Sequence, residues 1–245
     1  MKKILGIDVG ATGIKGAIVD TNKGELITPR HKIPTPTGAL PADVARVIEE
    51  LVEHFEWKGK PVGIGFPSVI RNNKVLTASN IDKSWIGMNL VKFLEKESGI
   101  NATALNDADA AGLAEMTHGQ GKNTKGIVIL LTLGTGIGSA IFKDGKLLEN
   151  SELGHLKFKG KIAEKIVANS VREKQDLSWK EYGTVLGEYL DHVYRLFYPD
   201  LIILGGGVSK KFEKYSEHFP KHIKVKPAAH QNAAGVIGAA MSQLV

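Results

Sequence analysis

The sequence contains no cysteine. Disulfide bonds, iron–sulfur clusters and cysteine-ligated zinc sites are therefore excluded. It also has no run approaching the roughly 20 apolar residues that cross a bilayer. The apolar start is interrupted by Asp8 too early for a signal peptide. These absences predict a cytoplasmic protein that does not enter a membrane.

The composition is that of a globular protein with an excess of basic residues. Of 245 residues, 42% are hydrophobic and 24% are charged, which allows one large domain or two small ones around a sizeable core. The net charge of +6 favours an anionic partner such as nucleic acid, an anionic membrane or a polyphosphate, unless the surface is merely basic. The aromatic-rich basic motifs of nucleic-acid modules do not occur.

Two glycine-rich segments, half a chain apart, resemble each other. Thr12–Ile14 aligns with Thr135–Ile137, and each segment lies between two apolar strands. Each unit is expected to be a strand, a glycine turn and a second strand, rather than a strand running into a helix. Unless short glycine motifs match by chance, this long-period repeat predicts a duplicated α/β domain.

Helical patterns separate the predicted strands. We expect helices beginning at Pro41, after Asn89 and after Ser178, the last with a capping box, and a helix of small residues over 235–244. The alternation of strands and helices favours mostly parallel sheets covered by helices.

The domain boundary is expected near Asp109. A smaller N-terminal domain would comprise residues 1–108, with the C-terminal helix at about 233–245 returning to it. A larger domain would comprise residues 109–232.

Glycine turns directly after strands are typical of phosphate-binding loops, because backbone N–H groups can approach anionic oxygens there. Thr12 and Thr135 add hydroxyl donors, and Lys15 adds a positive charge. A third glycine run, 205–207, follows another apolar strand. None of these loops fits the GxxxxGK[ST] pattern or the strand-to-helix GxGxxG pattern. One such loop is commonly a structural turn, but two related loops and a third indicate phosphate binding.

Asp8 ends the first strand beside the first glycine turn. Its carboxylate is suited to hold Mg²⁺ against phosphate oxygens, directly or through water. The alternative is an aspartate that caps the turn. Leu131 stands at the matching position of the second half, and this asymmetry favours a functional role for Asp8.

Polar side chains gather at two further places. Asn106, Asp107 and Asp109 follow an apolar strand, where open α/β sheets bind ligands. The two aspartates are a candidate base and its partner, or caps of the helix that starts near residue 108. Glu152 and His155 suit a polyhydroxyl ligand, although a lone histidine is usually structural and a Glu/His pair also occurs in metal sites.

Five segments of the chain carry a resemblance to a known family. They are DVGATGIKGA (8–17), NDADAAG (106–112), LGTGIGSA (133–140), ELGH (152–155) and GGGVSK (205–210). In this order they resemble the ROK family of sugar kinases and sugar-responsive repressors, within the actin-like ATPase superfamily. The resemblance covers essentially the whole chain. It implies a duplicated actin-like (ribonuclease H-like) α/β fold, with two domains around an active-site cleft.

The resemblance also implies roles for individual residues. Asp107 matches the catalytic aspartate, which acts as general base. The residues implied to contact the sugar are Asn80, Asn106, Asp107, Glu152, His155 and Glu164. Those implied to contact phosphate or nucleotide are Gly10, Thr12, Gly13, Lys15, Gly134, Thr135, Gly136, Gly205 and Gly206.

The chain departs from many family members in one respect. The cysteine-rich zinc motif that often follows the ELGH-like segment is replaced by LKFKGKIAE at 156–164, so no zinc is expected and His155 is not expected to bind it. The chain also starts directly at the first strand and leaves no room for a DNA-binding helix-turn-helix. A kinase is therefore expected rather than a repressor, with no DNA partner.

Among zinc-free members, the sequence is most similar to glucokinases that use inorganic polyphosphate. Residues 210–226 contain six lysines and two glutamates, and residues 157–165 add four lysines. Such a surface guides a long polyanion, or is simply a solvated charged face. We therefore expect phosphorylation of the glucose 6-hydroxyl with polyphosphate or ATP as donor and Mg²⁺ as cofactor. The resemblance also implies a homodimer.

Three alternatives use part of the same residues. An ATP-only glucokinase, or a kinase of mannose or an amino sugar, would keep all of them. A non-catalytic sugar-binding regulator would keep the sugar contacts without needing Asp107. A polyphosphate-binding protein without transfer activity would need only the basic surface.

Overall fold

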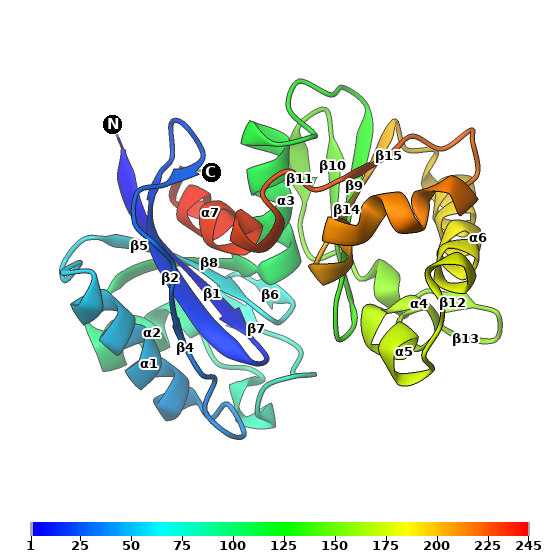
Figure 1. Cartoon of the computed structure of the whole chain (residues 1–245). Helices are drawn as coiled ribbons and strands as arrows, with labels where there is room; N and C mark the ends of the chain where they lie inside the picture. The colour runs from blue at the N-terminus through cyan, green and yellow to red at the C-terminus, as the bar shows by residue number, and fades with distance from the viewer. Residues whose placement is uncertain (1, 245) are drawn as a thin grey trace. The chain divides into compact units, whose positions relative to one another are not determined.

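The computed structural model describes residues 2–244. The chain forms two compact units, each built on one main sheet with helices (Figure 1). The first unit runs to Ala114 and takes up the chain again from Ala233, and the second is Glu115–Asn232. Within the described residues, no helix is long and apolar enough to cross a membrane.

The main sheet of the first unit has the strand order β3-β2-β1-β5-β8, with β4 also paired to β2. Its strands are β1 (Lys3–Gly10), β2 (Gly13–Asp20), β3 (Glu25–Leu26), β4 (His31–Ile33), β5 (Pro61–Phe66) and β8 (Asn101–Asn106). β1 and β2 form the expected hairpin, while β5 and β8 run parallel to β1. The carboxyl ends of β1, β5 and β8 therefore share one edge of the sheet.

The remaining elements of this unit are helices and one small hairpin. They are α1 (Pro41–His54), β6 (Ile70–Arg71), β7 (Lys74–Val75), η1 (Lys83–Trp85), α2 (Leu90–Ser98), α3 (Asp107–His118, which extends into the second unit), α7 (Ala234–Met241) and η6 (Ser242–Leu244). The predicted starts of α1 and α2 are confirmed. Asn89 Oδ1 accepts the Lys92 N–H at 3.0 Å, and Gly99 ends α2 with a positive φ of 62°.

The second unit repeats the plan, with strand order β11-β10-β9-β14-β15. Its strands are β9 (Ile127–Leu133), β10 (Ile137–Lys143), β11 (Lys146–Leu148), β14 (Leu201–Gly205) and β15 (Val225–Pro227), with a separate hairpin of β12 (Lys157–Phe158) and β13 (Lys161–Ile162). Its helices are η2 (Leu153–His155), α4 (Glu164–Val167), α5 (Asn169–Lys174), α6 (Trp179–Phe197), η3 (Gly207–Lys214), η4 (Ser216–His218) and η5 (Gln231–Ala233, whose last residue is counted in the first unit). The capping box of Ser178 and Glu181 begins α6, as predicted.

The expectation of mostly parallel sheets is wrong. In each main sheet the hairpin side is antiparallel and only the last two strands run parallel to the first. The glycine turns cause this, because a short turn reverses the chain and makes the next strand antiparallel. The duplication itself is confirmed by the matching strand orders.

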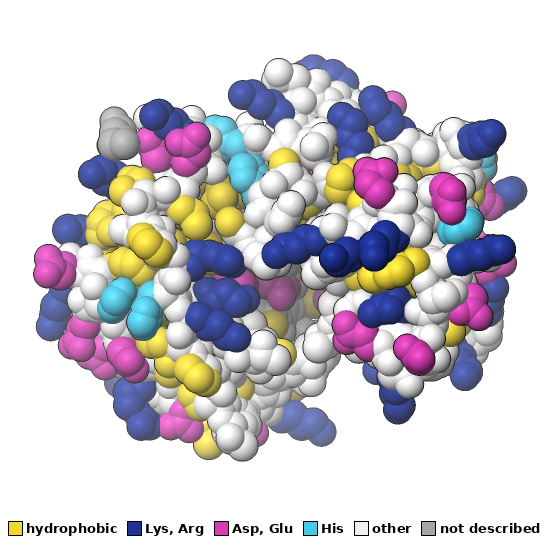
Figure 2. Space-filling model, viewed as in Figure 1, with side chains coloured by type: hydrophobic (Ala, Val, Ile, Leu, Met, Phe, Trp, Pro, Cys, Tyr) yellow, Lys and Arg dark blue, Asp and Glu magenta, His cyan; other side chains and the backbone are white. Residues whose placement is uncertain are grey.

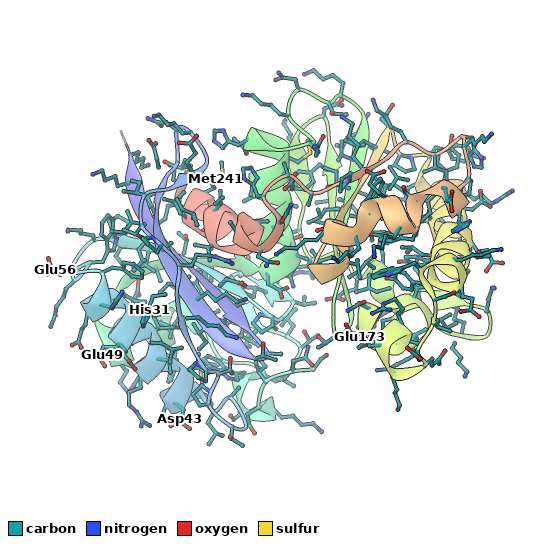
Figure 3. The ribbon with its side chains drawn as sticks, in the orientation of Figure 1. His31, Asp43, Glu49, Glu56, Glu173 and Met241 are labelled. Atoms are coloured by element: carbon teal, nitrogen blue, oxygen red, sulfur yellow. The ribbon has the colours of Figure 1, made fainter. Side chains whose placement is uncertain are left out.

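The last helix, α7, packs on β1 and β5 of the first unit. Glycines make this packing close: a Cβ at Gly6 would lie 2.0 Å from the Val236 carbonyl oxygen, and one at Gly63 would lie 1.7 Å from that of Ala239. Met241, labelled in Figure 3, ends the helix and is buried. Only residues without a side chain at these two strand positions let the helix approach so closely.

Candidate active site

An ion pair joins the two strands of the first hairpin beside its glycine turn. Asp8 and Lys15 are cross-strand neighbours, and Lys15 Nζ lies 3.2 Å from Asp8 Oδ2. The Asp8 side chain is 17% exposed. Thr35 Oγ1 donates to the Gly10 carbonyl at 2.6 Å and fixes the turn from outside. Thr12 is exposed at the tip of the turn, with its hydroxyl available to a ligand.

A second lysine, which the sequence did not indicate, lies over the same turn. A Cβ at Gly13 would come within 2.1 Å of Lys32 Cε, so the lysine stem runs across the glycine. Lys32 faces Lys15 across the β2–β4 pair. Pairing between strands far apart in sequence places it there, and no motif marks it.

Asp107 opens α3 at the carboxyl end of β8, and it is half-buried. Asn106 Oδ1 accepts the N–H groups of Ala108 and Asp109, while its Nδ2 donates to the Ser68 carbonyl at 3.1 Å. Asn106 thus caps the helix, and Asp107 Oδ1 also accepts the Ala108 N–H at 2.8 Å. Asn106 holds Asp107 at the sheet edge that also carries Asp8.

Asn80 lines a pocket of about 650 Å³ in the first unit. Ala11 of the glycine turn, Thr35 and Asp82 line the same pocket. The structure therefore brings Asn80, from a loop, next to the first glycine turn. Pocket walls of hydroxyl, amide and carboxylate groups suit a polar ligand.

The second glycine loop, Gly134–Gly136, is held by α5, whose Glu173 is labelled in Figure 3. Gly134 N–H donates to the Gly136 carbonyl at 3.0 Å. Ser170 donates twice to the loop, from its N–H to the Gly134 carbonyl and from its Oγ to the Thr135 carbonyl at 2.7 Å. Because these contacts use carbonyl groups, they fix the loop without occupying the Thr135 hydroxyl.

The ELGH segment forms a tight turn, η2, against β10. A Cβ at Gly154 would lie 2.4 Å from the Ile137 carbonyl oxygen, so glycine is needed for the approach. Buried Ser139 accepts the Leu153 N–H at 2.9 Å, and Tyr189 donates its hydroxyl to the Leu153 carbonyl at 3.0 Å. These two residues, which the sequence analysis missed, position Glu152 and His155.

Three predicted sugar residues come together in the second unit. Glu152 Oε2 lies 3.7 Å from His155 Nδ1. A Cβ at Gly136 would lie 2.6 Å from Glu164 Oε2, which places the Glu164 carboxylate against the second glycine loop. Burial raises the pKa of Glu152, His155 opposes this shift, and the nearby charge of Glu164 adds to it.

The third glycine run lies beside the second loop. Gly205 ends β14 and is paired with Thr132 of β9. Gly206 has a positive φ of 81°, and a Cβ there would collide with the Leu133 backbone at 2.3 Å. Both conditions require glycine. Four of the glycines predicted for phosphate and nucleotide, Gly134, Gly136, Gly205 and Gly206, thus lie at the carboxyl ends of neighbouring strands of the second sheet, whereas Gly10 and Gly13 belong to the first.

Lysines gather on the same unit along η3 and the segment into β15 (Figure 2). The six residues are Lys210, Lys211, Lys214, Lys221, Lys224 and Lys226. In the described part of the chain, none of them forms an ion pair with a carboxylate. In the segment 157–165, two of the four lysines are paired, Lys159 with Glu188 and Lys165 with Glu164. The six lysines of residues 210–226 therefore form no ion pair within residues 2–244 that would offset their positive charge.

These features define the class of protein. The two sheets of equal strand order, each containing a hairpin with a glycine turn, form an actin-like ATPase fold. A ROK-family glucokinase from Streptomyces griseus, solved with glucose and AMPPNP, has this fold with a TM-score of 0.83 at 23% identity, covering 98% of both chains.

Residues 4–164 match the model of the ROK family, and this chain belongs to that family. A protein named polyphosphate glucokinase from Mycobacterium tuberculosis (strain CDC 1551 / Oshkosh) is 48% identical, over 98% of this chain and 90% of the relative. The polyphosphate glucokinase of Mycobacterium leprae (strain TN) is 44% identical, over 97% of this chain and 73% of the relative.

A solved structure is similar over the whole length. The inorganic polyphosphate/ATP-glucomannokinase from Arthrobacter sp. strain KM has a TM-score of 0.95 and 43% sequence identity, covering 100% of this chain and 99% of that one. The expected resemblance and fold class are thereby confirmed.

Proposed function

We propose that this protein phosphorylates the 6-hydroxyl of glucose, with inorganic polyphosphate or ATP as phosphoryl donor. The observation that carries the proposal is the 48% identity, over nearly the full length, to proteins named polyphosphate glucokinase. The set of phosphate loops, sheet-edge aspartates and the Glu152–His155 turn supplies the groups that such a reaction needs.

Asp107 is proposed as the general base. Its carboxylate takes the proton of the 6-hydroxyl as the sugar oxygen forms a bond to the terminal phosphorus, while the bond from phosphorus to the donor's bridging oxygen breaks. The products are glucose 6-phosphate and a polyphosphate shorter by one unit, or ADP. Backbone N–H groups of both glycine loops and the Lys15 ammonium stabilise charge on the phosphoryl oxygens.

The sugar is proposed to bind through Asn80, Asn106, Glu152, His155 and Glu164. The carboxylates accept hydrogen bonds from sugar hydroxyl groups, while the histidine ring and the asparagine amides can both donate and accept. Because the solved relative at 43% identity is named a glucomannokinase, mannose is a second candidate acceptor.

Mg²⁺ is the proposed cofactor, with Asp8 as its residue. Among the described residues, no three His, Asp or Glu side chains form a metal-binding group. One carboxylate beside a phosphate loop instead fits a cation that keeps its waters and is shared with substrate phosphates. When bound, Mg²⁺ supplies positive charge to the phosphate oxygens. A cytoplasmic homodimer is also proposed; light scattering coupled to size exclusion tests the dimer, and a monomer at micromolar concentration would refute it.

The testing experiment measures glucose 6-phosphate formed from glucose and Mg²⁺, with long-chain polyphosphate and ATP supplied separately. Turnover with polyphosphate is expected. Turnover with ATP alone would remove polyphosphate from the proposal. Lack of turnover with either donor, for both glucose and mannose, would overturn the proposed activity.

A further inference from the structure

The helix α7 begins directly against the Asp8 carboxylate. A Cβ at Gly235 would lie 2.9 Å from Asp8 Cγ and 3.1 Å from each carboxylate oxygen. Gly235 does not have a positive φ, so its backbone conformation is open to any residue. Since alanine is the better helix former, the missing side chain has another reason, which is the space that Asp8 occupies.

The helix cannot move away to make room. Its carbonyl groups at Val236 and Ala239 lie against Gly6 and Gly63 of the sheet, and Gly238 would collide with the Ala110 backbone at 1.5 Å if it had a Cβ. All three contacts are with backbone atoms. Because these contacts are with backbone and the contact at Gly235 is with a side chain, an added methyl group at Gly235 is expected to displace the Asp8 side chain.

Asp8 has one further restraint, the ion pair with Lys15 at 3.2 Å. On one side, therefore, its carboxylate meets the ammonium group of the phosphate loop, and on the other it meets the first turn of α7. Displacement toward Lys15 would change both the direction of the carboxylate and the position of the lysine.

We propose that Gly235 is a positioning residue for Asp8. Because Gly235 has no side chain, the Asp8 carboxylate can lie directly against the first turn of α7, where an alanine methyl group would displace it. The effect on rate rests on the proposed function, because it needs Asp8 to take part in phosphoryl transfer. The steric coupling between Gly235 and Asp8 does not depend on that function.

A double-mutant cycle in thermal unfolding tests the coupling. Gly235→Ala should lower Tm in the native background. In the Asp8→Ala background it should leave Tm unchanged or raise it, because the clash is gone and alanine favours the helix. Gly207→Ala is the matched control, since no atom lies within 4 Å of a Cβ there, and it should change Tm equally in both backgrounds.

An equal fall in Tm for Gly235→Ala in both backgrounds would overturn the proposal, as would no fall in the native background. If Gly235→Ala is too unstable to purify alone, recovery of folded protein in the Asp8→Ala background is the expected result. Failure to recover it would overturn the coupling.

Kinetics separate positioning from mere stability. In folded Gly235→Ala, below its unfolding range, kcat should fall about 10- to 100-fold, as expected for a displaced active-site group, while the glucose KM stays unchanged. The double variant should be no slower than Asp8→Ala. A native kcat in Gly235→Ala would overturn the positioning role. An inactive unmutated protein would count against the proposed function instead, with the thermal cycle still decisive for the coupling.

Discussion

Glu152 Oε2 and His155 Nδ1 lie 3.7 Å apart on a single tight turn, and Glu164 acts on the same carboxylate from α4. Burial is the main cause that raises the pKa of Glu152, with Glu164 adding to it and His155 opposing it. An acid with a raised pKa in the folded state binds a proton more readily there than in the unfolded chain. Two consequences can be measured.

Replacing Glu152 by Gln should stabilise the protein at neutral pH. Because the folded pKa is raised, the contribution of Glu152 to stability is fully present below the ordinary value of 4.5 and is lost as the pH rises through the folded value. The gain in Tm from Glu152→Gln should therefore disappear at or below about pH 4. Thermal unfolding across this range checks it, and a gain that is equal at every pH would contradict it.

The pH dependence of sugar use should also report the ionisation of Glu152. The ionised carboxylate is the better acceptor for sugar hydroxyl groups, so kcat/KM for glucose should fall on the acid side at a pH above the ordinary value of 4.5. Glu164→Gln removes a negative neighbour and should move this fall to lower pH. The pH profiles of both proteins test the shift, and a profile that moves to higher pH would show that Glu164 does not act in this way.

Asp107→Ala should lower kcat by roughly 10²- to 10⁴-fold, because the proton of the 6-hydroxyl loses its acceptor. The fold should persist, since Asn106 Oδ1 still accepts the N–H groups of Ala108 and Asp109 when the Asp107 contact to Ala108 N–H is lost. Circular dichroism and Tm provide the folding control, and Asp43→Ala on α1 provides a matched surface control. A folded Asp107→Ala protein with near-native turnover would remove Asp107 from the base role.

Ser170→Ala should weaken use of the donor and spare the sugar. It removes the hydroxyl that donates to the Thr135 carbonyl at 2.7 Å, a hydrogen bond worth about 1 kcal/mol, or roughly fivefold in affinity. The KM for polyphosphate or ATP should rise by about that factor, with the glucose KM unchanged. A larger change for glucose than for the donor would mean that the second loop does not hold the donor.

Changing Lys210, Lys211 and Lys214 together to Gln should raise the polyphosphate KM and reduce its dependence on salt, because a long polyanion is attracted by uncompensated charge. The KM for ATP should change much less. A control triple on the first unit, Lys58, Lys92 and Lys96 to Gln, carries the same loss of charge. If both triples have equal effects, net charge alone governs polyphosphate use.

The fold was predictable where local sequence decides it. The capping box at Ser178, the Asn89 cap and the glycine turns all specify their elements within a few residues, and the structure has them where expected. Sheet direction was not predictable in the same way. Periodicity shows that a strand exists, but its partner is set by contacts between residues far apart in the chain.

The residues of the candidate site also fall into two groups, those that local motifs predict and those that only the tertiary structure brings in. The glycine loops, Asp107 and Glu152 occur in motifs that sequence alone displays. Lys32, Ser170 and Tyr189 do not, because each reaches the site by packing of a separate element: the β2–β4 pair, α5 and α6. Asn106 differs from both groups. It lies in a motif that the sequence displays, but its role as the helix cap follows only from its hydrogen bonds to Ala108 and Asp109.

The return of α7 to the first sheet also has a consequence for protein synthesis. The glycine-lined faces of β1 and β5 are made early, whereas the helix that covers them follows the entire second unit in the chain. During translation, the strands of the second unit are therefore all synthesised while the glycine-lined face of the N-terminal sheet still lacks the helix that covers it.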